Sequence, residues 1–217
     1  MAVINVNPTR MELTNMKKKL VTARRGHKLL KDKRDELMRQ FLELVKENKA
    51  LRIKVENGIS AVNTRMALAV SSMSDESLSV ALMMPSQKMS VDVKQKNIMS
   101  VIVPEFEAKY KTADKSDIYS YGFAFTSGDL DDAVKNLSDI MPDMLRLAQI
   151  EKTCQLLSSE IEKTRRRVNA LEHVMIPRYE ETIKYIVMKL DENDRSTTTR
   201  LMKIKDMMLE NSHSYTL

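Results

Sequence analysis

A repeating pattern of apolar residues constrains the fold of this chain more than any other feature. Between Leu13 and Val55, alternating steps of three and four residues define a seam of thirteen positions, and ten of them are apolar. This spacing predicts a long α-helix whose apolar stripe must pack on a partner helix. The seam comprises Leu13, Met16, Leu20, Ala23, His27, Leu30, Arg34, Leu37, Phe41, Leu44, Asn48, Leu51 and Val55.

The same chain supplies a partner of matching pattern near its other end. There the seam comprises Leu147, Ile150, Cys154, Leu157, Ile161, Thr164, Val168, Leu171 and Met175. The sequence therefore predicts a mainly α fold, in which the N-terminal and C-terminal arms form a long antiparallel two-helix coiled coil. If Leu13 lies near Arg200, Glu47 falls near residues 165–167, which are all arginines.

Three regions are expected along the chain: an N-terminal arm (1–72), a middle region (73–128) and a C-terminal arm (129–217). In the middle region, alternating Met89, Val91 and Val93 precede alternating Met99, Val101 and Val103, so we expect a β-hairpin at about 89–103 that turns in the polar stretch 94–97. A second alternating run, with aromatic residues at 119, 121, 123 and 125, indicates either another strand or an irregular packed segment.

Helix ends and irregularities also leave signals. Thr9 followed by Glu12 resembles a capping box, so the first helix is expected to begin there and to continue past Gly58 to about residue 72. Ser127 suits the start of the second arm. Pro142 and Pro177 are expected to kink it, and a run of four-residue steps from Leu171 to Ile183 should relax the supercoil locally.

Composition and motifs argue against an enzyme. The chain has four glycines, ten aromatic residues and no tryptophan, which is little material for an ordinary catalytic core. It lacks nucleotide-binding loops and metal-ligand spacing, so no catalytic residue, cofactor or metal is predicted. Its single cysteine, Cys154, is interpreted as a buried apolar residue; the enzymatic alternative requires that thiol to be exposed and acidic. With no apolar stretch long enough to cross a bilayer, we expect a cytoplasmic chain without direct membrane insertion.

Positive charge is concentrated in one stretch of the first helix. Residues 10–34 hold ten Lys or Arg residues against Glu12 and Asp32, which favours an acidic partner. A solvated helix face explains the same pattern. A basic coiled-coil protein that binds nucleic acid, with aromatic side chains near Tyr121 stacking on bases, is the main alternative function.

Residues in both arms together resemble a known family. The sequence Asn7-Pro8-Thr9-Arg10 with Leu13, the segment from Ala23 to Leu37, and the segment from Glu160 to Glu172 followed by Ile176-Pro177 resemble the D subunit of V-type and A-type ATPases. Asn97-Ile98-Met99 with Val101 and Pro104 is similar to the hairpin of that family. Ser100 stands where the family commonly has glycine, and residues 196–199 replace a more charged stretch.

The resemblance implies a non-catalytic central rotor shaft. In that family the paired helices enter a ring of catalytic A and non-catalytic B subunits, the F subunit binds alongside, and a funnel-like C subunit links the shaft to the membrane ring at the cytoplasmic face. Such a shaft requires no nucleic acid. We hypothesise that cations of the first helix contact the A/B hexamer: Arg10, Lys17, Lys18, Lys19, Arg24, Arg25 and Lys28. We also hypothesise that the hairpin tunes hydrolysis or subunit contacts through Val91, Val93, Asn97, Ile98, Met99 and Val101.

Overall fold

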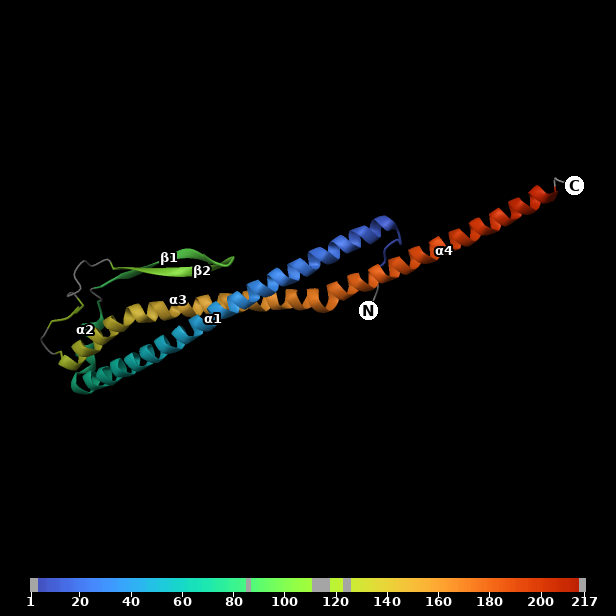
Figure 1. Cartoon of the computed structure of the whole chain (residues 1–217). Coiled ribbons are helices and arrows are strands. Elements are labelled where there is room, and N and C mark those ends of the chain that lie inside the picture. The colour runs from blue at the N-terminus through green and yellow to red at the C-terminus, as the bar shows by residue number, and fades with distance from the viewer. Residues whose placement is uncertain (1–3, 85–86, 111–117, 123–125, 215–217) are drawn as a thin grey trace. The chain divides into compact units, whose positions relative to one another are not determined.

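The computed structural model describes residues 4–84, 87–110, 118–122 and 126–214. Helix α1 (Arg10–Ser72) is followed by the short helix α2 (Asp75–Leu82) and by two strands, β1 (Met89–Ile98) and β2 (Val101–Tyr110). The second arm consists of α3 (Gly128–Ala170), the π-helical segment η1 (Leu171–Met175) and α4 (Ile176–Ser214). The expected mainly α fold with two long arms and a middle hairpin is confirmed (Figure 1).

Both arms begin at the predicted positions, but only Thr9 caps its helix with a side chain, because the buried Ser127 hydroxyl has no hydrogen-bond partner among the described residues. The backbone N–H of Glu12 donates to Thr9 Oγ1 at 3.2 Å, and α1 then continues without interruption through Gly58. At the start of α3, the backbone N–H of Leu130 donates to the carbonyl of Ser127, and Asp129 and Asp131 lie in the positive first turn. These local signals determine where the arms begin because they satisfy backbone donors that helix geometry leaves free.

Two compact units divide the chain. The terminal unit comprises Met1–Arg34 and Lys163–Leu217, and the hairpin unit comprises Asp35–Glu162. In the terminal unit, Arg10 pairs with Asp194 at 3.3 Å and Arg24 with Glu180 at 2.6 Å, so α1 and α4 run antiparallel there. Because Arg10 begins α1, the part of α4 beyond Asp194 has no α1 turn beside it.

The arms of the hairpin unit are also antiparallel, but the predicted register is wrong. Glu47 accepts a hydrogen bond from Arg146 at 2.5 Å, whereas the heptad pattern alone placed it near residues 165–167. Lys54 pairs with Asp143 at 2.6 Å and Arg65 with Asp129 at 3.4 Å, which continues the same alignment. Heptad seams fit in several registers, so packing partners outside the seam decide among them.

Those additional partners come from the hairpin. Leu37 of α1 and Leu157 and Ile161 of α3 form a buried cluster with Val101 and Val103 of β2. Figure 1 shows β1 and β2 beside α3, and the backbone N–H of Phe106 donates to Gln149 Oε1 at 3.2 Å. A second cluster joins Ala69, Ala81 and Leu130 near the α2 end of this unit.

The hairpin turn lies later than predicted. Strands β1 and β2 pair antiparallel from Met89 opposite Tyr110 to Ile98 opposite Val101, so the polar stretch 94–97 belongs to β1. Met99 (φ 49°) and Ser100 (φ 73°) make the turn, and the N–H of Ser100 donates to Asn97 Oδ1 at 2.8 Å. Two successive residues with positive φ are typical of a type I′ turn, whose twist matches that of the strands.

Residues 118–122 are irregular, with Tyr119 and Tyr121 packed edge to face at a centroid distance of 6.0 Å. The Tyr121 hydroxyl donates to Asp131 Oδ1 at 2.8 Å, and burial followed by this carboxylate raises the pKa of the phenol. Over these residues the irregular alternative holds and the strand does not. The other two aromatic residues of the run, Phe123 and Phe125, lie outside the described residues.

Candidate functional site

The predicted basic residues of α1 divide into two sets. Arg10 and Arg24 are exposed but form ion pairs with Asp194 and Glu180 of α4, which link the two helices at the surface of the terminal unit. Within the part of the chain that the structure describes, no ion pair is found for the other five, and all five are exposed. These five free cations are Lys17, Lys18, Lys19, Arg25 and Lys28.

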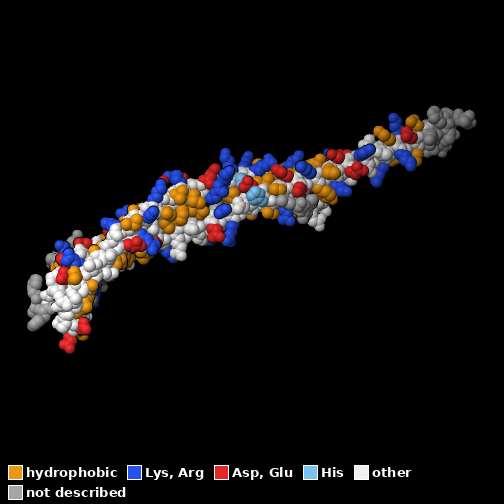
Figure 2. All heavy atoms as spheres, turned by 90° about the horizontal axis from the view of Figure 1, so that it is seen from below, with side chains coloured by type: hydrophobic (Ala, Val, Ile, Leu, Met, Phe, Trp, Pro, Cys, Tyr) orange, Lys and Arg blue, Asp and Glu red, His pale blue; other side chains and the backbone are white. Residues whose placement is uncertain are grey.

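Position on the helix does not by itself separate the two sets, because Lys17 and Lys28 lie on the same side of α1 as Arg10 and Arg24. Arg10, Lys17, Arg24 and Lys28 recur at spacings of seven and four, so they follow one side of α1. This side flanks the seam, which brings the long arginine side chains within reach of carboxylates on α4. Arg25 lies further round the helix, whereas Lys18 and Lys19 line a hollow with Leu171 and Met175 of the second arm. Figure 2 shows Lys and Arg side chains interspersed with Asp and Glu over the displayed face.

Of the six hairpin residues singled out from the sequence, four have structural roles. Val101 is buried, Ile98 and Met99 pack against the same cluster, and Asn97 closes the turn. The other two, Val91 and Val93, are exposed on the opposite face, where Val93 is opposite Phe106 and Val91 opposite Ala108. Ile102 and Tyr110 share this face and are also exposed, and the prediction omitted them.

The face of the hairpin that carries Val101 and Val103 becomes charged further from the turn. Lys94 forms an ion pair with Glu107, and Lys109 forms one with Asp92 across the strands. Hydrogen bonding to these carboxylates raises the pKa of both lysines. The hairpin thus has an apolar end that packs on α1 and α3 and, further from the turn, one ion-paired face and one apolar face.

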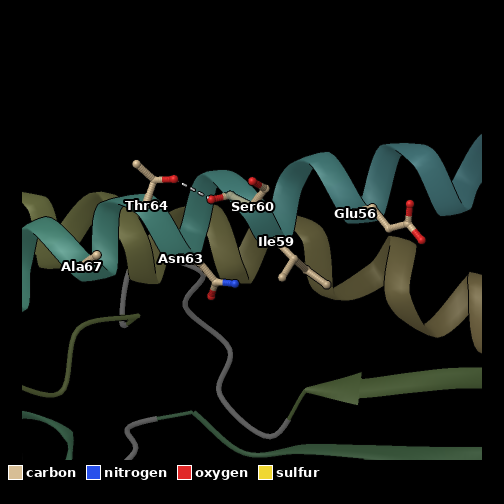
Figure 3. A pocket seen from close by; sticks show the side chains of 6 residues that line it. All are labelled: Glu56, Ile59, Ser60, Asn63, Thr64 and Ala67. Carbon is tan, nitrogen blue, oxygen red and sulfur yellow. Dashed lines mark hydrogen bonds between the residues drawn. The ribbon is translucent and has the colours of Figure 1, made fainter.

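A further surface, which the sequence prediction missed, follows α1 in the hairpin unit. Met38, Leu42 and Val45 are exposed at helical spacing, with Leu42 53% accessible. Further along the same side is an open hollow of about 590 Å³. Its lining residues, shown in Figure 3, are Glu56, Ile59, Ser60, Asn63, Thr64 and Ala67.

This surface, which we call the α1 outer face, combines exposed apolar side chains with a hollow that is lined mainly by small and polar side chains. In Figure 3, Ile59 and Asn63 project to the same side of α1, while the Thr64 hydroxyl turns back and donates to the Ser60 carbonyl at 2.8 Å. In the sequence, the steps of four and three between Met38, Leu42 and Val45 indicate this apolar stripe. The prediction overlooked it because the seam that pairs the two arms is the stronger pattern in the same helix. An exposed stripe of this kind suits the packing of another helix.

No group of three or more His, Cys, Asp or Glu side chains among the described residues is placed to hold a metal ion. Cys154 is only partly buried, a correction to the buried interpretation. Burial, followed by the charge of Glu151, raises the pKa of its thiol, which opposes the formation of a nucleophilic thiolate. No described helix is long and apolar enough to cross a membrane.

Comparison with known proteins identifies the family. The family model for the ATP synthase D subunit matches residues 12–206. The V-type ATP synthase D subunit of Acetivibrio thermocellus is 61% identical over 215 residues, covering 99% of this chain and 97% of that protein. Its counterpart in Clostridioides difficile is 62% identical over 210 residues, covering 97% of this chain and 94% of that protein. Because the match includes both helical arms and the hairpin between them, this chain belongs to the family of ATP synthase D subunits.

Proposed function

We propose that this chain is the central shaft of a rotary V-type ATP synthase, which transmits torque between an A/B hexamer and the membrane rotor ring. The observation that carries this proposal is the near full-length similarity to V-type D subunits over two arms that pair antiparallel in each unit. An antiparallel helical pair suits a mechanical element. The catalytic steps then belong to the hexamer, and this chain acts on them through contacts.

The coupling follows from symmetry. A single asymmetric shaft inside a threefold ring makes different contacts with three chemically identical sites, so its angle favours a different conformation at each. Binding of nucleotide at a site that prefers one shaft angle then shifts the shaft toward that angle, because the coupling free energy is reciprocal. Torque arises from this preference without any reaction on the shaft itself.

We assign the hexamer contact to the five free cations of α1. Lys17, Lys18, Lys19, Arg25 and Lys28 have long side chains that can exchange partners as the shaft turns. Arg10 and Arg24 contribute indirectly, since their ion pairs keep α1 aligned with α4. This assignment narrows the original set of seven residues to five.

The remaining partners are assigned to the hairpin unit. The α1 outer face suits a helix of the F subunit of the stalk, with Leu42 and Val45 as apolar anchors. The end of α2 exposes Val80, Met83 and Met84, which suit a contact with the funnel-like C subunit. The exposed hairpin residues Val91 and Val93 would then modulate subunit contacts. In this arrangement the complex lies at the cytoplasmic face of the membrane.

The direct test is reconstitution. The purified chain is mixed with an A/B hexamer, stoichiometry is determined by native mass spectrometry, and ATPase activity is measured on the same sample. One copy per hexamer with altered turnover is expected. Absence of binding at moderate salt, together with steeply salt-dependent binding to DNA or RNA, would favour the nucleic-acid alternative.

Matched variants test the contact residues. Replacing Lys17, Lys18 and Lys19 together by Gln should weaken hexamer binding and flatten its salt dependence. The control replaces Lys88, Lys135 and Lys152, three exposed lysines of the hairpin unit, and removes the same charge. Equal effects of the two variants would mean that overall charge, and not this part of α1, determines binding. A separate Leu42→Glu variant should reduce binding of the F subunit while leaving hexamer binding intact.

A further inference from the structure

Packing in the terminal unit is loose at one level of the helix pair. No α1 residue between Met16 and Arg34 is buried, and no residue of the second arm is buried between Val168 and Thr182. On either side of this gap the second arm has fully enclosed side chains, with Val168 at 1% and Thr182 at 0% accessibility. Buried side chains therefore hold the two helices together on both sides of this stretch, but within the stretch the helices are only weakly held.

The backbone is irregular at the same level. Residues Leu171–Met175 form a π turn, and the N–H of Ile176 donates to the carbonyl of Leu171. The extra residue in the seam requires this turn, and Pro177 is compatible with it because proline has no N–H to donate and its ring would clash with the carbonyl four residues earlier in a regular α-helix. The π turn accommodates one extra residue, which also explains the four-residue steps of the seam here.

The facing turn of α1 contains a helix-weakening residue without a packing need. A Cβ added at Gly26 would meet nothing within 4 Å, so close approach of a neighbour does not require glycine there. Glycine inside a helix is nevertheless less favourable than alanine because it has more conformational freedom to lose. His27 Nε2 lies 3.4 Å from Glu172 Oε2, which places Gly26 beside the π turn.

A hollow also lies between the two helices at this level. It measures about 360 Å³ and is lined by Lys18, Lys19, Thr22 and Ala23 of α1 and by Leu171, Met175 and Tyr179 of the second arm. Two of its lining residues belong to the π turn itself. Movement of the helices at this level therefore displaces few tightly packed atoms.

We infer that Gly26 and the π turn form a conformational joint in the terminal unit. A π turn can move along a helix when one hydrogen bond spanning five residues is exchanged for one spanning four. Such an exchange rotates the part of α4 beyond the turn relative to the part before it, while the hollow and Gly26 let α1 follow. The use of this joint to absorb twist in a turning shaft rests on the proposed function.

Hydrogen–deuterium exchange of the full chain tests the joint without any partner. Amides of residues 20–30 and 169–180 are expected to exchange at least about tenfold faster than those of 184–194, which belong to the same unit. Equal protection in these three segments would overturn the inference. This outcome is independent of reconstitution with the hexamer, so failure of the proposed shaft function and failure of the joint are distinguishable.

Two variants sharpen the test. Gly26→Ala should slow exchange in 20–30 about fivefold, because the methyl group enters open space and favours the helix. Thr14→Ala is the control, since it raises helix propensity at an exposed position of α1 away from the joint and should leave 20–30 unchanged. If both variants change the joint equally, the effect is general and the inference is wrong.

The π turn can be removed separately. Deletion of Val174 together with Pro177→Ala restores an uninterrupted α-helical pattern and should slow exchange in 169–180 to the rate of 184–194. Pro177→Ala alone keeps the extra residue and should leave exchange fast. If the deletion leaves the helix content unchanged and the amides of 169–180 still exchange as fast as before, the inference of a joint is wrong. If the deletion lowers the helix content, the Gly26→Ala variant becomes the deciding test of the joint.

Discussion

The terminal unit and the hairpin unit use the same antiparallel helical pair but bury it differently. In the terminal unit the buried residues are separated along the helices, with Met16, Val168 and Ile186 as apolar examples. In the hairpin unit, Leu37 and Leu157 are enclosed by Val101 and Val103 from a third direction. Two helices alone leave much of each seam half-exposed, and a hairpin laid on them converts the seam into a core. Stability should therefore concentrate in the hairpin unit.

The largest expected effect compares truncations of two fully enclosed side chains. Leu157→Ala removes the centre of the hairpin-unit cluster and should lower the free energy of unfolding by about 4 kcal/mol. Ile186→Ala in the terminal unit should cost only about 2 kcal/mol, because two helices can close partly around the gap. Urea unfolding followed by circular dichroism measures both.

Leu42→Ala is the control for this comparison, since Leu42 is exposed in the isolated chain and its truncation should change stability by less than about 0.5 kcal/mol. Equal losses for Leu157→Ala and Ile186→Ala would show that the two units are equally well packed and would remove the basis of the comparison.

Glycine-to-alanine replacement should have opposite signs in the two units. At Gly58, the added Cβ would lie 2.5 Å from Cδ1 of Ile140, so Gly58→Ala should destabilise the hairpin unit by about 1–2 kcal/mol. At Gly26 the space is open, so Gly26→Ala should stabilise the terminal unit by about 1 kcal/mol. Thermal unfolding of each variant gives both signs.

A double-mutant cycle identifies the cause at Gly58. In an Ile140→Ala background the clash is gone, so Gly58→Ala should become neutral or stabilising. Persistence of the full loss in that background would mean that the glycine serves another purpose.

The hairpin turn allows a smaller test. Ser100→Gly should stabilise the hairpin unit by about 1 kcal/mol, because glycine adopts the positive φ of this position without the steric cost that serine carries. The hydrogen bond from the backbone N–H to Asn97 Oδ1 remains possible. Protection of hairpin amides against hydrogen exchange reports the change.

The same substitution at Ser90 should change the stability of the hairpin unit in the opposite direction. Ser90 is in the extended part of β1, where glycine loses more entropy, so that variant should be destabilised by about 0.5–1 kcal/mol. Stabilisation by both substitutions would point away from the turn geometry as the cause.

The smallest perturbation is chemical. Because the pKa of the Cys154 thiol is raised, the thiolate fraction at pH 7–8 is below that of a free cysteine, and the thiol should react with iodoacetamide several times more slowly in the folded chain than in denaturant. As pH rises toward the elevated pKa, the folded rate should increase. A folded rate above the denatured one would revive the enzymatic alternative.

Local signals in the sequence determined the elements and most of their limits. The Thr9 cap, the Ser127 start and the two seams predicted both arms because each depends on neighbours within about one or two helical turns. The alternation of Val91 and Val93 with Val101 and Val103 predicted a hairpin. The basic stretch of α1 was equally evident, and eight of its ten cations are exposed, as expected of a charged helix face.

Tertiary structure decided register, turn position and which candidates are free. Glu47 pairs with Arg146 because the hairpin fixes the neighbouring turns of α1 and α3, and a periodic seam cannot specify that alignment by itself. The turn lies at Met99 and Ser100 because Val101 and Val103 must face Leu157. Likewise, Arg10 and Arg24 differ from Lys17 only through the carboxylates that α4 brings beside them. Periodicity is a property of one segment, whereas pairing depends on distant residues, so only the folded chain could settle it.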